Sequence, residues 1–145
     1  MSLQNLVGVG LEEIAPSRQT IRRLLDGAAR QIRDSKVKAV SPETRFGSAY
    51  TAIRMLADVG LHAHGYRTLT SRPGHHQTAL QALPLTLGLE SRVVVRLDAL
   101  RKQRNLTEYT GDAVPEATVM ECLAQAEALC AATISWLEAH KPDLL

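Results

Sequence analysis

The chain has 145 residues, of which 45% are hydrophobic and 22% charged, and its net charge is +2. These values predict one soluble domain over 1–145, with a single hydrophobic core at about 17–140. No uninterrupted apolar run of 18 residues and no basic leader before an apolar stretch occurs. We therefore expect no transmembrane helix, no secretory signal and a cytoplasmic location.

The first half of the chain predicts two long helices. After Pro16 and Ser17, apolar residues recur at helical spacing up to Ile32, while five arginines lie largely elsewhere, which indicates an amphipathic helix with a basic outer face. A second helix begins with Ser41 as N-cap and Pro42 at its first position, and continues to about His64. Its expected buried side is formed by Phe46, Tyr50, Ile53 and Leu56.

Gly65, Pro73 and Gly74 then interrupt the pattern, and three more helices follow. A short helix begins near His75, and Pro84 should kink or end it. The next begins at about residue 90 and stops by Gly111, and the last runs from about 115 to 140. No convincing alternation predicts a strand. The expected fold is an all-α, up-and-down bundle of four to five helices.

Cys122 and Cys130 are eight residues apart in the last expected helix. A rise of about 1.5 Å per residue separates them by about 12 Å, too far for a disulfide. We expect both to be small core or near-core residues in a reducing compartment.

The charges are unevenly distributed along the chain. Residues 14–104 contain 16 of the 17 Lys and Arg residues and 6 of the 15 acidic residues, whereas 105–145 contain one Lys and seven acidic residues. This division suggests an acidic partner for the basic part, or association of basic with acidic faces. The alternative is a solvated helical surface.

The segment "LRKQRNLTEYTGD" is the only stretch whose residues indicate a particular chemistry. It gathers three cations, an amide and a phenol, namely Arg101, Lys102, Arg104, Asn105 and Tyr109. Guanidinium groups suit bidentate phosphate contacts, and the polar groups can orient a ribose or a proton. On a helix Arg104 and Tyr109 lie about 140° apart, so they converge only if the helix loosens near its end. The plainer interpretation pairs Arg104 with Glu108, with Asn105 as a cap and Tyr109 packed against the protein with its hydroxyl outward.

"LRKQRNLTEY" resembles the signature of HEPN domains (higher eukaryotes and prokaryotes nucleotide-binding), in which a helix ends in Arg, usually followed by Asn or Asp, with His four to six residues after the Arg. "GYRTLTSRPGHHQTALQAL" is similar to the Gly-Tyr-Arg … Gly-His-His segment of a HEPN subgroup whose later motif reads Arg-Asn-x-x-x-Tyr. The resemblance covers about 17–140. It implies a helical bundle that dimerises, with two motif copies meeting in a shared basic cleft. Many members are metal-independent ribonucleases, often toxins of toxin–antitoxin pairs, and several partner with a nucleotidyltransferase.

By this resemblance Arg104 would hold the scissile phosphate, and Asn105 would orient the arginine or a ribose hydroxyl. Tyr109 occupies the place of the ribonuclease His, and a phenol with a pKa of about 10 is a poor general base at pH 7. Arg101, Lys102 and His76 are further candidates for phosphate or substrate contacts.

His75 and His76 open the third helix, where the helix dipole should lower a histidine pKa and keep the ring able to accept a proton. A solvated or capping pair is the alternative. His62 and His64 diverge around a helix without nearby acidic or Cys ligands, so we expect no zinc site. Phosphate-loop and dinucleotide motifs do not occur, and no cofactor is expected.

Three hypotheses stay open from the sequence. The first is a HEPN-like homodimer that binds or cleaves RNA, possibly as a toxin. The second is a non-catalytic HEPN-like module that binds a nucleotide or a partner protein, such as a nucleotidyltransferase or antitoxin. The third is a helical bundle without a nucleic-acid role.

Overall fold

The computed structural model describes residues 2–145. Six helices dominate it: α1 (Arg18–Ser35), α2 (Pro42–Ala63), α3 (His75–Gln81), α4 (Leu83–Thr86), α5 (Ser91–Thr110) and α6 (Glu116–His140). Two short strands, β1 (Leu11–Glu13) and β2 (Tyr66–Thr68), and two 3-10 turns, η1 (Gln4–Leu6) and η2 (Pro142–Leu144), complete it. The predicted all-α fold class is confirmed.

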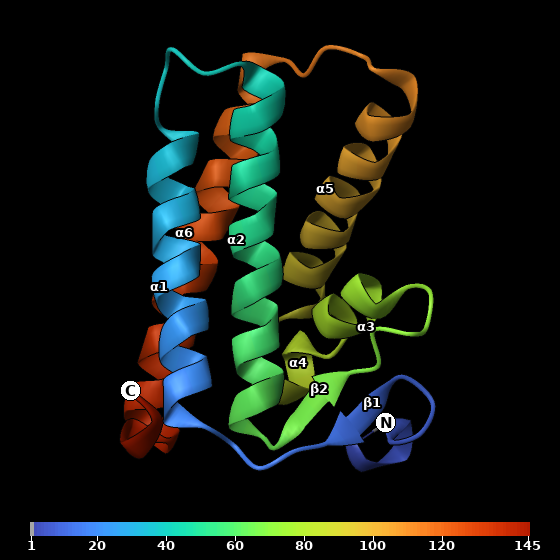
Figure 1. Ribbon diagram of the computed structural model, residues 1–145, viewed down its shortest axis with the longest axis vertical. Helices are drawn as coiled ribbons and strands as arrows, with labels where there is room; N and C mark the ends of the chain where they lie inside the picture. The colour runs from blue at the N-terminus through green and yellow to red at the C-terminus, as the bar shows by residue number, and fades with distance from the viewer. Residues whose placement is uncertain (1) are drawn as a thin grey trace.

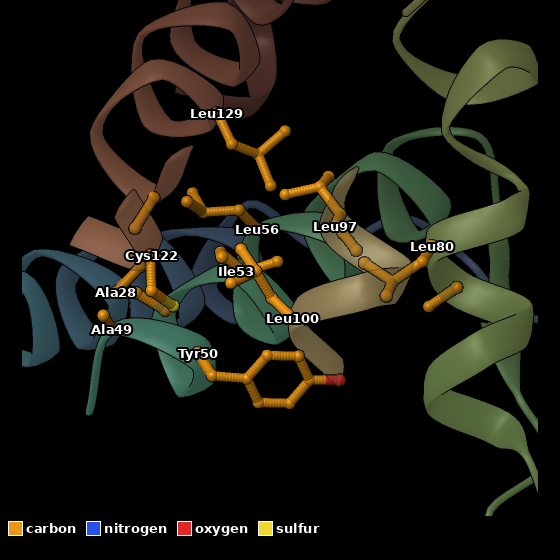
Figure 2. Close-up of a cluster of buried hydrophobic side chains, with 14 of the residues drawn as sticks. Ala28, Ala49, Tyr50, Ile53, Leu56, Leu80, Leu97, Leu100, Cys122 and Leu129 are labelled. Atoms are coloured by element: carbon orange, nitrogen blue, oxygen red, sulfur yellow. The ribbon is translucent and has the colours of Figure 1, made fainter. Parts of the chain in front are cut away.

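Helix α2 is the central element of the bundle. It packs against α1 and α6 on one side, and against α3, α4 and α5 on the other (Figure 1). Helices α1 and α5 lie on opposite sides of α2, and α5 leans away from α2 toward its own C-terminal end (Figure 1). The core lies between these helices and includes Ile53, Leu56, Leu80, Leu97 and Leu129 (Figure 2).

The ends of the helices follow the predicted capping residues. The Thr44 amide donates to the Ser41 hydroxyl oxygen at 3.3 Å, and Pro42 occupies the first turn of α2. The expected effect of Pro84 is also confirmed, because α3 ends at Gln81 and a separate short helix, α4, contains the proline.

The sequence showed no convincing strand pattern, and the structure adds one small two-stranded sheet to the all-α bundle. Strand β1 pairs antiparallel with β2, with Leu11 opposite Thr68 and Glu13 opposite Tyr66. Each strand has three residues, too few to establish an alternating pattern. Burial of Leu11, which is 0% exposed, fixes this pairing through the tertiary fold.

The basic face of α1 is exposed, as predicted; its arginines are Arg18, Arg22, Arg23, Arg30 and Arg33. Because α1 lies across α2 from α5, this face does not border the "RKQRNLTEY" segment (Figure 1).

Helix α6 supplies apolar side chains to the core on one side. Cys122 is buried and Cys130 half-buried, and both are free thiols, as predicted. By length and composition α6 is also long and apolar enough to cross a membrane, although it has no uninterrupted apolar run. Here it packs against α2 and α1.

Candidate functional site

Helix α5 stays regular through the whole motif segment. It ends at Thr110, and Gly111, with a φ of 70°, forms the left-handed C-cap whose amide donates to the Thr107 carbonyl at 2.8 Å. The helix therefore does not loosen between Arg104 and Tyr109. Tyr109 is 92% exposed, whereas the Arg104 side chain is only 28% exposed. Arg104 and Tyr109 therefore do not converge within one chain.

Arg104 turns inward, onto α2. Its guanidinium carbon lies 5.3 Å from the centroid of the Tyr50 ring, within the range of a cation–π contact. One terminal nitrogen lies 3.1 Å from a carboxylate oxygen of Glu108, the ion pair that the plainer interpretation expected. The Nε atom is buried and has no hydrogen-bond partner within residues 2–145. Arg104 therefore keeps an unused donor on its inner side.

Arg101 lies three residues before Arg104, and its side chain is also largely buried. Its Nε donates to Asp98 Oδ1 at 2.7 Å, and both side chains are about 15% exposed. Partial burial alone would raise the pKa of Asp98, but the hydrogen bond and charge of Arg101 hold it below its usual value. Lys102 is exposed and reaches the same carboxylate at 3.5 Å. Asn105 is exposed.

Tyr50 brings α2 into the same site. Its side chain is 1% exposed, yet its hydroxyl finds no hydrogen-bond partner in the described part of the chain. Figure 2 shows the ring at the margin of the core, with the hydroxyl pointing away from Ala49 and Cys122. Burial raises the pKa of Tyr50 to about 12, and the charges of Arg104, Arg101 and Arg54 act in the opposite direction. The Arg104 guanidinium therefore lies against the ring of a buried tyrosine whose hydroxyl has no partner in the described residues.

Arg54 and Asp58 follow Tyr50 at intervals of four residues along α2, so the three share a stripe. The Arg54 Nη1 lies 3.8 Å from Asp58 Oδ2. Burial raises the pKa of the Asp58 carboxyl to about 6, although Arg54 and His75 act to lower it. Arg54 and Asp58 were not among the predicted site residues, although two charges beside the expected core face of this helix indicate the stripe.

His76 comes from α3, which packs against both α2 and α5. The ring is half-buried and meets the His75 ring edge-on, with centroids 4.3 Å apart. Burial, followed by the nearby charges of His75 and Arg54, lowers the pKa of His76 to about 4. Arg104 and Arg101 add to this effect. The pKa is lowered, as the sequence suggested, and burial is the largest cause.

Arg54 lies on α2, and Arg101 and Arg104 lie on α5, which packs against α2; we call these three residues the arginine cluster. Three of the residues singled out from the sequence, Arg101, Arg104 and His76, are partly buried and lie on two helices, α5 and α3, that pack against each other. It leaves Lys102, Asn105 and Tyr109 on the exposed side of α5. Guanidinium groups of this kind can bind an oxyanion through charge-assisted hydrogen bonds.

A cavity of about 200 Å³ adjoins Arg104 at the end where α5 leans away from α2. Phe46 and Gly47 line its α2 side, and Thr107 and Glu108 its α5 side. Arg104 is thus reachable from solvent through this opening.

In comparisons with known proteins, no family model matches the chain. No curated protein and no solved structure matches it either.

Proposed function

We propose that this protein is a HEPN-like, cytoplasmic RNA-binding protein that acts as a homodimer and holds the RNA phosphate backbone at the arginine cluster. The observation that carries the proposal is the Arg104 guanidinium, which lines the cavity between α2 and α5 and is paired there with the exposed carboxylate of Glu108. A terminal guanidinium nitrogen that pairs with a ligand oxygen forms a charge-assisted hydrogen bond, worth about 1.5–3 kcal/mol. A phosphate offers several such oxygens with a matching charge.

The ion pair between Arg104 and Glu108 does not block this role. Glu108 is 61% exposed, and an exposed pair of this kind contributes about 0–1 kcal/mol. A phosphate can therefore displace Glu108 from the outer edge of the guanidinium. The Arg101–Asp98 pair is largely buried and keeps Arg101 in position.

The proposal is tested by titrating a labelled single-stranded RNA, followed by fluorescence anisotropy at several salt concentrations. We expect Arg104→Gln to weaken binding at least about tenfold, because it removes a charge-assisted contact. Arg22→Gln is the matched control, since it removes an exposed arginine on the far side of α2, and it should change affinity less than about twofold. Circular dichroism checks that both variants fold.

Glu108→Gln tests the same site through a change of RNA affinity in the opposite direction. Removing a carboxylate beside the bound phosphate should strengthen RNA binding by about threefold at low salt, because a like charge some 6 Å away costs about 0.7 kcal/mol in water. The gain should shrink as salt is added. Unaltered binding by Arg104→Gln, or salt-independent affinity in the wild type, would show that the arginine cluster is not the RNA site.

The second candidate function is a non-catalytic HEPN-like module that binds a nucleotide or a partner protein, such as a nucleotidyltransferase or antitoxin. The exposed apolar side chains of α5 favour it, namely Val95, Leu106 and Tyr109, which are 68%, 59% and 92% exposed. If this second function is correct, the protein should co-purify stably with a partner and should not cleave RNA. A partner that dissociates when Leu106 is changed to Glu would identify this face as the contact.

A further inference from the structure

We infer that the exposed face of α1, together with the connection from α1 to α2, docks on an anionic lipid bilayer. Helix α1 lies on the opposite side of α2 from α5 (Figure 1). This surface is therefore separate from the arginine cluster, and the inference goes beyond the proposed function without depending on it.

The exposed face of α1 is a stripe of guanidinium groups. At about 100° per residue, the five arginines of the helix lie within an arc of about 140° and extend over about 22 Å along its axis. All of them are exposed. The other charged residues of α1 are two aspartates, so five positive and two negative side chains give the helix a net charge of +3. The arginines are Arg18, Arg22, Arg23, Arg30 and Arg33.

The positive charge of this stripe is not neutralised by the rest of the protein. Within residues 2–145 none of its arginines forms an ion pair with an acidic side chain. Arg18 donates to the Leu145 carbonyl at 2.6 Å, and Arg23 donates to the Thr20 hydroxyl at 3.4 Å. The members of the arginine cluster, by contrast, each lie beside a carboxylate. The α1 face therefore has charge available for an anionic partner outside the chain.

The connection that follows α1 adds exposed apolar side chains to this charge. Val37 is 46% exposed and Val40 36% exposed, and the lysines on either side of Val37, Lys36 and Lys38, are exposed as well. The connection lies at the end of the bundle away from both chain termini (Figure 1). The basic stripe of α1 thus continues into a segment in which lysines and valines reach solvent together.

An anionic bilayer suits both parts of this surface. Lipid phosphates bind guanidinium and ammonium groups, and the boundary between headgroups and acyl chains accepts valine side chains. A basic face on an amphipathic helix is typical of proteins that bind anionic membrane surfaces. RNA suits the surface less well, because α1 has no aromatic side chain on which a base could stack and RNA has no apolar layer for the valines.

Sedimentation of the full-length protein with lipid vesicles tests the inference. Vesicles of phosphatidylcholine with about 30% phosphatidylglycerol should bind the protein, and added salt should weaken this binding. Vesicles of phosphatidylcholine alone should bind it at least about tenfold more weakly. Since each arginine near an anionic surface contributes about fivefold, Arg22→Gln, Arg30→Gln and Arg33→Gln together should weaken binding about 100-fold.

A matched triple variant removes the same charge at positions away from α1. Arg72→Gln, Arg92→Gln and Arg96→Gln change exposed arginines on the β2–α3 connection and on α5, and together should alter vesicle binding less than about threefold. Circular dichroism checks that both triple variants fold. Equal weakening by the two variants would mean that net charge alone attracts the protein, and would overturn the inference. Equal binding to both kinds of vesicle, or to neither, would also overturn it.

The exposed valines are tested separately from the charge. Val37→Ser and Val40→Ser together should weaken binding to the anionic vesicles about tenfold and leave its salt dependence unchanged, because they remove apolar contact and no charge. Val9→Ser is the matched control, since Val9 is 63% exposed and lies outside the proposed surface, and it should change binding less than about twofold. Wild-type affinity in the double variant would overturn the role of the connection.

RNA binding by the same variants distinguishes this surface from the proposed function. The α1 triple variant should keep RNA affinity within about threefold of the wild type, and Arg104→Gln should keep its affinity for vesicles. Loss of RNA binding by the α1 triple variant, with no vesicle binding by the wild type, would assign α1 to RNA and overturn the inference. A wild type that binds anionic vesicles but no RNA would overturn the proposed function and leave this inference standing.

Discussion

Arg45 illustrates how a single side chain joins three helices. The side chain is 4% exposed, and its Nε donates to the Ser35 carbonyl at the end of α1 at 2.9 Å. Its Nη1 lies 2.9 Å from Glu116 at the start of α6. One guanidinium therefore satisfies a carbonyl that the last turn of α1 leaves free and holds the first turn of α6 in place.

Arg45→Met should lower the free energy of unfolding by about 2 kcal/mol, because the buried Ser35 carbonyl loses its donor and finds no replacement. Glu116→Gln should cost less than about 1 kcal/mol, since the Glu116 side chain is 51% exposed and water can take the place of the ion pair. Chemical denaturation of both variants checks this. Equal losses would mean that the ion pair, and not the carbonyl contact, carries the stability.

Asp58 gives stability a pH dependence with a defined sign. Its pKa is about 6 in the folded protein against an ordinary value of 3.8, so the fold favours the protonated carboxyl. This contribution is complete below about pH 4 and is lost as the pH rises through about 6. Asp58→Asn should therefore raise the free energy of unfolding by about 1–2 kcal/mol at pH 7, and the gain should disappear near pH 4.

Denaturation of the wild type and Asp58→Asn at several pH values checks this difference. His76, whose pKa is lowered, acts on the wild-type profile with the opposite sign, losing stability as the pH falls through about 4. Only the difference in the free energy of unfolding between the wild type and Asp58→Asn isolates the contribution of Asp58. A gain that is constant with pH would contradict the raised pKa.

At the scale of single elements, α2 contains a pair of glycines in contrasting surroundings. A Cβ added at Gly47 meets nothing within 4 Å, whereas one at Gly60 would lie 2.8 Å from Thr86 Oγ1 and 3.1 Å from its Cβ. Thr86 is itself buried, so it has little room to move. Gly60 is thus required by the close approach of α4, and Gly47 is not.

Gly47→Ala should stabilise the protein by about 0.5–1 kcal/mol, the usual gain in a helix interior. Gly60→Ala should destabilise it by about 1–3 kcal/mol through overpacking against Thr86. Thermal or chemical denaturation of the pair measures both changes in the same helix. Two changes of the same sign would contradict the packing between α2 and α4.

Helix α5 is anchored in the core through its N-terminal half. Its buried residues are Leu97 and Leu100, and no residue from 101 to 110 is buried. The half of the helix that carries Arg104 is therefore held by the Tyr50 contact and by side-chain pairs on its surface. We expect the amides of 103–110 to exchange with solvent well before those in the middle of α2, as hydrogen-exchange mass spectrometry can measure. Saturating RNA should slow their exchange, and equal protection in both helices would contradict this.

Most of these elements could be predicted because their causes are local. Ser41 and Pro42 define the start of α2, and Pro84 separates α3 from α4. The pairing of Leu11 with Thr68 could not be predicted, since it joins segments more than 50 residues apart and depends on burial in the finished fold. The residues of the candidate site likewise divide into those predictable from the local sequence and those that depend on tertiary packing. Arg101 and Arg104 belong to a visible motif, whereas Tyr50 and Arg54 join them only through the packing of α2 against α5.

At the scale of the whole molecule, α5 presents two different faces. Val95, Leu106 and Tyr109 lie within an arc of about 60° on the exposed side, and Arg104 lies about 180° from Val95. Apolar side chains that gather on an exposed helix face are typical of an interaction surface. Two copies of the chain that pair through this stripe would leave both arginine clusters open to RNA.

The proposed homodimer therefore has a specific test. Light scattering at micromolar concentration should give about twice the chain mass of 15.8 kDa, and Leu106→Glu should give the monomer mass with unchanged circular dichroism. Val37→Glu is the matched control, because Val37 is 46% exposed on the connection between α1 and α2, far from the stripe, and it should stay dimeric. A monomeric wild type would refute the dimer. A dimeric Leu106→Glu would instead place the contact on another face, because a charge buried at the stripe cannot be accommodated without a partner.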